Sequence, residues 1–161
     1  MSTPQSHDIH VLNGLIETTL DSADGYREAA GETEDRRFKT LFEQRSFERQ
    51  GLAGDLKGAV LTLGGEPEED GSVLAKAHRA FLDVKHALLR DEQAVVNSVE
   101  NGEDFIKARF EKALEDSDVS EATRETIRRA YATVKDGHDQ MRDLKHSLEG
   151  QKDAGNPLFP N

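Results

Sequence analysis

The sequence predicts an all-α protein, a bundle of long amphipathic helices. Its 161 residues include only 4 prolines, 2 tyrosines and no tryptophan, and they are rich in Ala, Leu, Glu, Lys and Arg, a composition typical of helical proteins. Apolar residues recur every three or four positions through five segments, which is the period of a helix with one buried face. The length suits one domain with a substantial core and is too short for two ordinary ones.

Charge and cysteine content narrow the classes of function. The chain has 21 basic and 32 acidic residues, a formal net charge of -11, which argues against nucleic acid as a partner because phosphate binding needs a basic surface. No run of about 18 apolar residues predicts a membrane span, and the N-terminal residues do not resemble a secretion signal. The chain contains no cysteine, which excludes disulfides and thiolate ligands and fits a cytoplasmic protein.

The first two helices are expected to form an antiparallel pair. Residues 1–7 are expected to be flexible, and the first helix should run from about Asp8 to Ala30. Its buried face is marked by a regular stripe: Leu12, Ile16, Thr19, Ala23 and Tyr26. Gly31 ends this helix, and the short link after it returns the chain into a second helix over residues 38–63.

Three more helices follow an acidic loop at residues 66–71. Ser72 should cap a shorter third helix that ends near Leu89, and Asp91 should cap a fourth that ends near Asp116. Ser120 should cap a fifth helix that ends near Leu148. Residues 149–161 are expected to be a flexible tail, so the predicted bundle comprises residues 8–148.

The loops leave two topologies open. If the short third helix crosses from one end of the bundle to the other, the second and fourth helices are parallel. This is the single-crossover four-helix bundle of ferritin-like proteins. If every neighbour is antiparallel instead, the result is a five-helix up-and-down bundle. Polar residues on the predicted core faces favour the first topology.

Those polar residues are the main anomaly in the sequence. One face of the second helix is predicted to hold Leu41, Arg45, Glu48, Leu52, Leu56, Ala59 and Leu63. Glu48 is therefore expected at mid-helix, where a core should be driest. Glu103 and His138 hold similar places on the fourth and fifth helices. A buried carboxylate is costly unless it is paired, protonated or bound to a metal.

Several separated motifs resemble a bacterial ferritin-like family of unknown function. The resemblance covers about residues 10–146 and rests on the segment from Leu12 to Tyr26 and on four shorter motifs: Phe47-Glu48-Arg49, Leu63-Gly64-Gly65-Glu66-Pro67, Ala77-His78-Arg79 and Asn101-Gly102-Glu103-Asp104. It implies a ferritin-like four-helix bundle with an additional short crossover helix. By analogy with stress-induced relatives it also implies a role in stress or metal handling, but it implies no activity.

A metal centre is the first functional hypothesis. Ferritin-like dimetal sites take one Glu from each of two helices and a Glu-x-x-His pair from each of the other two. Glu48, Glu103 and His138 are the best ligands for iron, manganese or zinc, and three further carboxylates could join them: Glu17, Asp21 and Glu100. No Glu-x-x-His occurs in the chain, which counts against a ferroxidase-like enzyme and favours a non-catalytic protein.

The second hypothesis requires no metal. In it, Arg45 pairs with Glu48 or Glu103 and His138 completes a buried network that fixes the helix register. The protein would then be a stress-associated scaffold that works as a homo-oligomer or binds a partner. Such binding would use an exposed apolar patch, expected along Phe47, Leu82 and Leu89.

Overall fold

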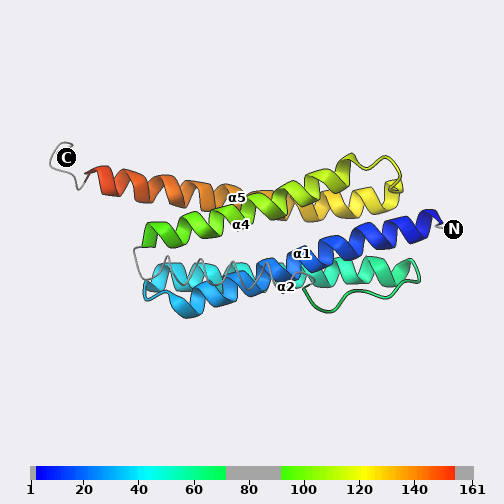
Figure 1. The fold of residues 1–161 in the computed structure, drawn as a ribbon, viewed down its shortest axis with the longest axis horizontal. Helices are drawn as coiled ribbons and strands as arrows, with labels where there is room; N and C mark the ends of the chain where they lie inside the picture. The colour runs from blue at the N-terminus through cyan, green and yellow to red at the C-terminus, as the bar shows by residue number, and fades with distance from the viewer. Residues whose placement is uncertain (1–2, 72–91, 155–161) are drawn as a thin grey trace.

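A computed structural model describes residues 3–71 and 92–154 of the chain, and these form four helices (Figure 1). They are α1 (Pro4–Glu32), α2 (Arg36–Thr62), α4 (Glu92–Glu115) and α5 (Glu121–Ala154). No strand occurs in the two described ranges, so the all-α prediction is confirmed. The predicted third helix and the predicted Asp91 cap lie outside the described residues.

The helix ends differ from the predicted boundaries by more than two residues in two places. Helix α1 begins at Pro4 rather than near Asp8, because the Thr3 hydroxyl caps it by accepting a hydrogen bond from the Ser6 backbone N–H at 3.0 Å. Proline suits the first turn, where no backbone donor is needed. Helix α5 continues to Ala154, beyond the predicted end at Leu148. A glycine within a helix is unfavourable but tolerated, and Gly150 does not end this one.

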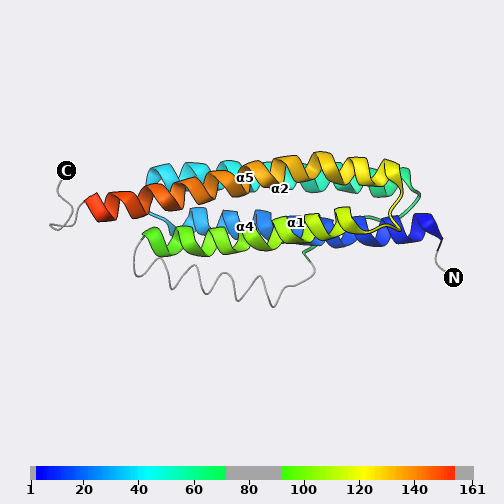
Figure 2. The same cartoon turned by 90° about the horizontal axis from the view of Figure 1, so that it is seen from above.

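The helices form two antiparallel pairs, α1 with α2 and α4 with α5, which pack on each other through α1–α4 and α2–α5 contacts. Figure 1 shows the two pairs as layers, and Figures 1 and 2 both show α2 and α4 running in the same direction. The end of α2 and the start of α4 therefore lie at opposite ends of the bundle. Of the two topologies considered, the structure has the one with α2 and α4 parallel.

A side chain from α1 joins the end of the bundle to the start of α5. The Asp8 carboxylate is 2% exposed and accepts hydrogen bonds from the Ser120 backbone N–H at 3.0 Å, the Ser120 hydroxyl at 2.5 Å and the Thr123 hydroxyl at 2.9 Å. Burial alone would raise the pKa of Asp8, but these hydrogen bonds lower it below its usual value. Asp8 thus supplies a second cap for α5, in addition to the predicted cap Ser120.

The apolar core is divided into two clusters along the bundle. The first lies toward the start of α1 and the end of α2: Leu12, Leu15, Ile16, Leu52, Leu56, Val60, Ile106, Phe110, Ala113, Val119, Ile127, Ala130 and Val134. The second lies toward the end of α1 and the start of α2: Tyr26, Ala29, Ala30, Phe38, Phe42, Val95, Val96, Val99 and Met141. In the described ranges, no helix contains an apolar stretch long enough to cross a membrane.

Candidate functional site

A polar layer lies between the two apolar clusters, and its centre is a buried ion pair. Arg49 on α2 is 0% exposed and Glu103 on α4 is 1% exposed, and Arg49 Nη2 donates to Glu103 Oε2 at 2.8 Å. Breaking such a pair is costly because the remaining charge has no water to solvate it. The pair therefore holds α2 and α4 in a fixed relation across the bundle.

Helix α1 supplies further partners to both charges. The Tyr26 hydroxyl donates to Glu103 Oε1 at 2.7 Å, so both carboxylate oxygens of Glu103 are engaged. Arg49 Nη1 donates to the Ser22 hydroxyl at 3.2 Å, and the Arg49 guanidinium lies 5.9 Å from the centre of the Tyr26 ring. Burial, together with the charge of Glu103, raises the pKa of Tyr26 well above its ordinary value. The phenol therefore stays a hydrogen-bond donor.

A second buried arginine extends the layer to α5. Arg45 is 5% exposed, donates to Glu48 Oε1 at 2.8 Å and also hydrogen-bonds to the Gln140 side chain. Gly137 gives both guanidinium groups room, since a Cβ atom there would lie 2.5 Å from Arg49 Nη2 and 3.1 Å from Arg45 Nη1. All four described helices thus contribute to the layer, which contains two ion pairs, Arg49–Glu103 and Arg45–Glu48.

The prediction that Glu48 faces the core is wrong, because its side chain is 40% exposed. The buried arc of α2 also contains Phe42, Arg49, Ala53 and Val60, which lie beside the predicted stripe. Helix α2 packs against both α1 and α5, so its buried face is wider than one column and is centred away from Glu48. The sequence pattern did not identify Arg49 as a core residue, because it lies outside the predicted apolar stripe.

Two elements of the network hypothesis are confirmed, but His138 does not complete the network. Arg45 pairs with Glu48, one of the two partners considered for it, and Glu103 is buried as expected. Glu103, however, pairs with Arg49. The predicted place of Tyr26 on the buried face of the first helix is confirmed.

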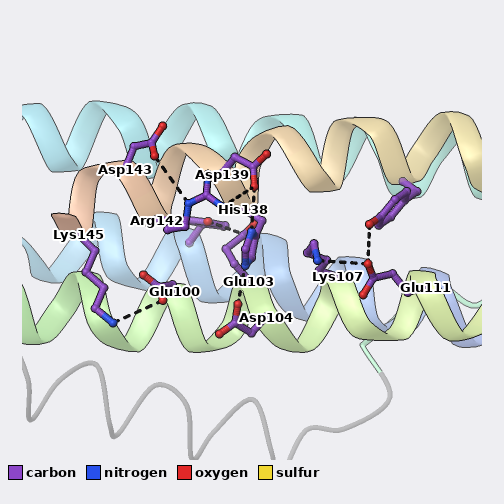
Figure 3. Close-up of polar contacts among 12 residues, drawn as sticks. Glu100, Glu103, Asp104, Lys107, Glu111, His138, Asp139, Arg142, Asp143 and Lys145 are labelled. Carbon is purple, nitrogen blue, oxygen red and sulfur yellow. Dashed lines mark hydrogen bonds and ion pairs between the residues drawn. The ribbon is translucent and has the colours of Figure 1, made fainter. Parts of the chain in front are cut away.

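His138 lies at the edge of the α4–α5 contact rather than in the polar layer (Figure 3). Its Nε2 is 2.5 Å from Asp104 Oδ1 and its Nδ1 is 3.3 Å from Asp139 Oδ1. The hydrogen bond to His138 is the main reason that the pKa of Asp139 is lowered. Farther along the same contact, Glu100 lies 3.5 Å from Lys145.

Two predicted ligands on α1, Glu17 and Asp21, are half-buried and do not form a ligand group with Glu103 or His138. Asp21 packs against the loop after α2, since a Cβ atom on Gly71 would lie 1.9 Å from Asp21 Oδ1. In the described ranges, three candidate ligand atoms come within 4.8 Å of one another at one place, His7, Asp116 and Asp118. The six predicted ligands form no such set.

The group at His7 was not expected, because residues 1–7 were predicted to be flexible and His7 is far in sequence from its neighbours. His7 Nε2 lies 2.8 Å from Asp116 Oδ2. The other oxygen, Asp116 Oδ1, accepts from the Asp118 backbone N–H at 2.9 Å. The Asp118 hydrogen bond, followed by that of His7, lowers the pKa of Asp116. These contacts join α1 to the loop between α4 and α5.

The sequence matches a known protein family. The family model described as "Domain of unknown function (DUF2383)" matches residues 7–116, well over half of the chain. The match contains Tyr26, Arg49 and Glu103 and ends before α5. No curated protein matches the sequence.

Proposed function

We infer that this chain, which belongs to the family described as domain of unknown function DUF2383, acts as a non-catalytic helical-bundle scaffold. One observation carries the proposal: both oxygens of the buried Glu103 carboxylate are engaged by the protein's own Arg49 and Tyr26. The carboxylate best placed to bind a metal in the core thus already has a charged partner. In a scaffold, this partner has a structural role.

That role is to select one alignment of the helices. Sliding α2 along α4 by one turn, about 5.4 Å, would separate Arg49 from Glu103 and leave two charges in apolar surroundings. Apolar side chains are less selective, because they can repack after such a shift with smaller losses. Polar core residues fix register in this way in coiled coils.

Binding of iron, manganese or zinc stays a prediction, and elemental analysis tests it against the scaffold. Wild-type protein, Glu103→Gln and His7→Ala would each be incubated with each metal, desalted and measured by mass spectrometry. Glu121→Gln, at an exposed Arg-paired position, is the matched control for Glu103→Gln. We expect no stoichiometric metal in any of the four proteins.

Near-stoichiometric metal in wild-type protein and in the control that is lost in Glu103→Gln would overturn the proposal, and oxidation of iron(II) would then be assayed. Metal that is lost only in His7→Ala would support an unchanged core, with a metal at the end of the bundle. The stress-associated role implied by the family resemblance also stays a prediction.

A further inference from the structure

The solvent face of α2 carries large apolar side chains at both ends of a regular row. Phe47 is 79% exposed and Leu61 is 63% exposed. Between them stand Gly51, Gly54 and Gly58, all exposed. The spacing of these five positions alternates between four and three residues, so they lie in one row along the helix. We call residues 47, 51, 54, 58 and 61 the α2 row.

The glycines of the α2 row are not explained by packing within the chain. Glycine is a poor helix former, yet a Cβ atom at Gly51, Gly54 or Gly58 would meet nothing within 4 Å. Gly137 differs, since a Cβ there would press on Arg49. Because these three glycines have no side chains, another helix can approach the backbone of α2 closely between the two exposed apolar residues.

We propose that this face binds α2 of a second copy of the chain, in an antiparallel arrangement with a two-fold axis at Gly54. The inference rests on the proposed scaffold function and supplies its partner. Phe47 and Leu61 are each seven residues from Gly54, or about 10.5 Å along the helix. An antiparallel pair centred at Gly54 therefore sets Phe47 against the partner's Leu61 twice. The row is complementary to itself, as a two-fold interface requires.

Charge favours the same pairing. The chain has a net charge of -11, so two copies repel each other over most of their surfaces. Among the described helices, α2 alone has more basic than acidic side chains, with three acidic and six basic ones. Two of the six, Arg45 and Arg49, are buried. The other four are Arg36, Arg37, Lys39 and Lys57. Contact through α2 therefore keeps apart the most acidic helices of the two copies, α1 and α4. Beside the row, Lys57 would lie near the partner's Gln50.

Sedimentation velocity over a concentration series tests the pairing. We expect the wild-type chain of 17.9 kDa to form a dimer of about twice that mass. Phe47→Lys and Gly54→Lys should each weaken dimerisation at least tenfold. Both positions are exposed and lysine is a better helix former than glycine, so circular dichroism should show both variants folded. Gly102→Lys, at an exposed glycine of α4, is the matched control and should dimerise as wild type.

Cross-linking tests the direction of the two helices, and the absence of native cysteine makes single-cysteine variants specific. With a short bismaleimide, Gly54→Cys should cross-link to itself, and Phe47→Cys should cross-link to Leu61→Cys in a mixture. Phe47→Cys alone should not, because two copies of residue 47 would be about 21 Å apart along the axis.

Asp55 offers a test in the opposite direction. It follows Gly54, so the two-fold axis brings both copies of this acidic side chain to one flank of the pair. Asp55→Asn should therefore strengthen dimerisation.

A wild-type monomer at all concentrations, a dimer unaffected by Phe47→Lys and Gly54→Lys, or self-linking of Phe47→Cys would each overturn this pairing. None of these outcomes concerns metal in the core. Conversely, metal that depends on Glu103 would overturn the scaffold proposal without changing the cross-linking pattern. The two failures are therefore distinguishable.

Discussion

Replacing Glu103 by glutamine removes one charge from the core and keeps the shape of the side chain. Arg49, which is fully buried, then loses its counter-ion and keeps only neutral acceptors, the Ser22 hydroxyl and at most the one oxygen of the new amide. The new amide NH₂ must also face a donor, either Tyr26 or Arg49, because both oxygens of Glu103 accept hydrogen bonds in the native protein. The variant is therefore expected to be strongly destabilised.

The size of the loss follows from the burial of the pair. Two unit charges about 4 Å apart at an effective dielectric constant of about 20 attract by about 4 kcal/mol. Removing one partner of a buried pair costs about 3–5 kcal/mol in general. Since Arg49 and Glu103 are 0% and 1% exposed, we expect a value in this range. It would be a large part of the roughly 5–15 kcal/mol that stabilises a typical domain.

Urea denaturation followed by circular dichroism at pH 7 measures this loss. Glu121→Gln removes a carboxylate that is 83% exposed and paired with Arg124, so it should lower the free energy of unfolding by less than about 1 kcal/mol. A loss below about 1 kcal/mol for Glu103→Gln would refute the reasoning, because a fully buried arginine would then tolerate the absence of its counter-ion.

Removing the polar groups of Arg49, Glu103 and Tyr26 together should restore stability. The triple variant Arg49→Met, Glu103→Leu, Tyr26→Phe leaves no charge and no unpaired hydroxyl at these positions, and apolar replacements of buried ion pairs are often neutral or stabilising. We expect its free energy of unfolding to be within about 2 kcal/mol of wild type, and therefore above that of Glu103→Gln. A triple variant less stable than the single one would contradict this account.

Three further predictions concern other parts of the core. The pKa of Tyr131 is raised to about 12 by burial and its hydrogen bond to Glu111, and burial also raises the pKa of Tyr26 well above its ordinary value. Absorbance titration should therefore show no tyrosine ionising near pH 10 until the protein is unfolded. Because the fold lowers the pKa of Asp8, its ionised form contributes stability above the unfolded value of about 3.9, and that contribution is lost as pH falls through the folded pKa. Asp8→Asn should cost about 1.5–3 kcal/mol in urea at pH 7 and weaken this acid dependence. Gly137→Ala should lower the melting temperature, since its Cβ would lie 2.5 Å from Arg49 Nη2, whereas Gly102→Ala, in open space, should raise it.

Most of the fold could be predicted from the sequence because helix periodicity and helix ends are local signals. The 3.6-residue period placed the four described helices, and Ser120 marked a helix start. Gly31 does not end the first helix as predicted, since α1 continues through it to Glu32. The relative direction of α2 and α4 could not be derived, since it depends on packing between distant segments. The start of α1 was missed although Thr3-Pro4 is a cap followed by a favourable first residue.

The sequence predicted a polar layer in the core, but not all of the residues that form it. Glu103 and Arg45 interrupt apolar stripes and were identified for that reason. Arg49 lies in a second buried column of α2, and one helix read alone does not reveal that it packs against two neighbours. Glu48 was placed in the core by the same error. The burial of Arg49 depends on its partner Glu103 on α4, which also accepts a hydrogen bond from Tyr26 on α1. The periodicity of a single helix contains no information about such partners.

Glu103 can compensate Arg49 or a metal ion, but one carboxylate does not compensate both. The layer contains two buried cations, Arg45 and Arg49, balanced by Glu48 and Glu103. A divalent ion placed about 4 Å from Arg49 would be repelled by about 8 kcal/mol at an effective dielectric constant of about 20. Offsetting that repulsion needs additional buried carboxylates, and Glu48, the other acidic member of the layer, is 40% exposed and already paired. For metal to bind at Glu103, Arg49 would have to leave the core, so the arginine that fixes the helix register also opposes a metal there.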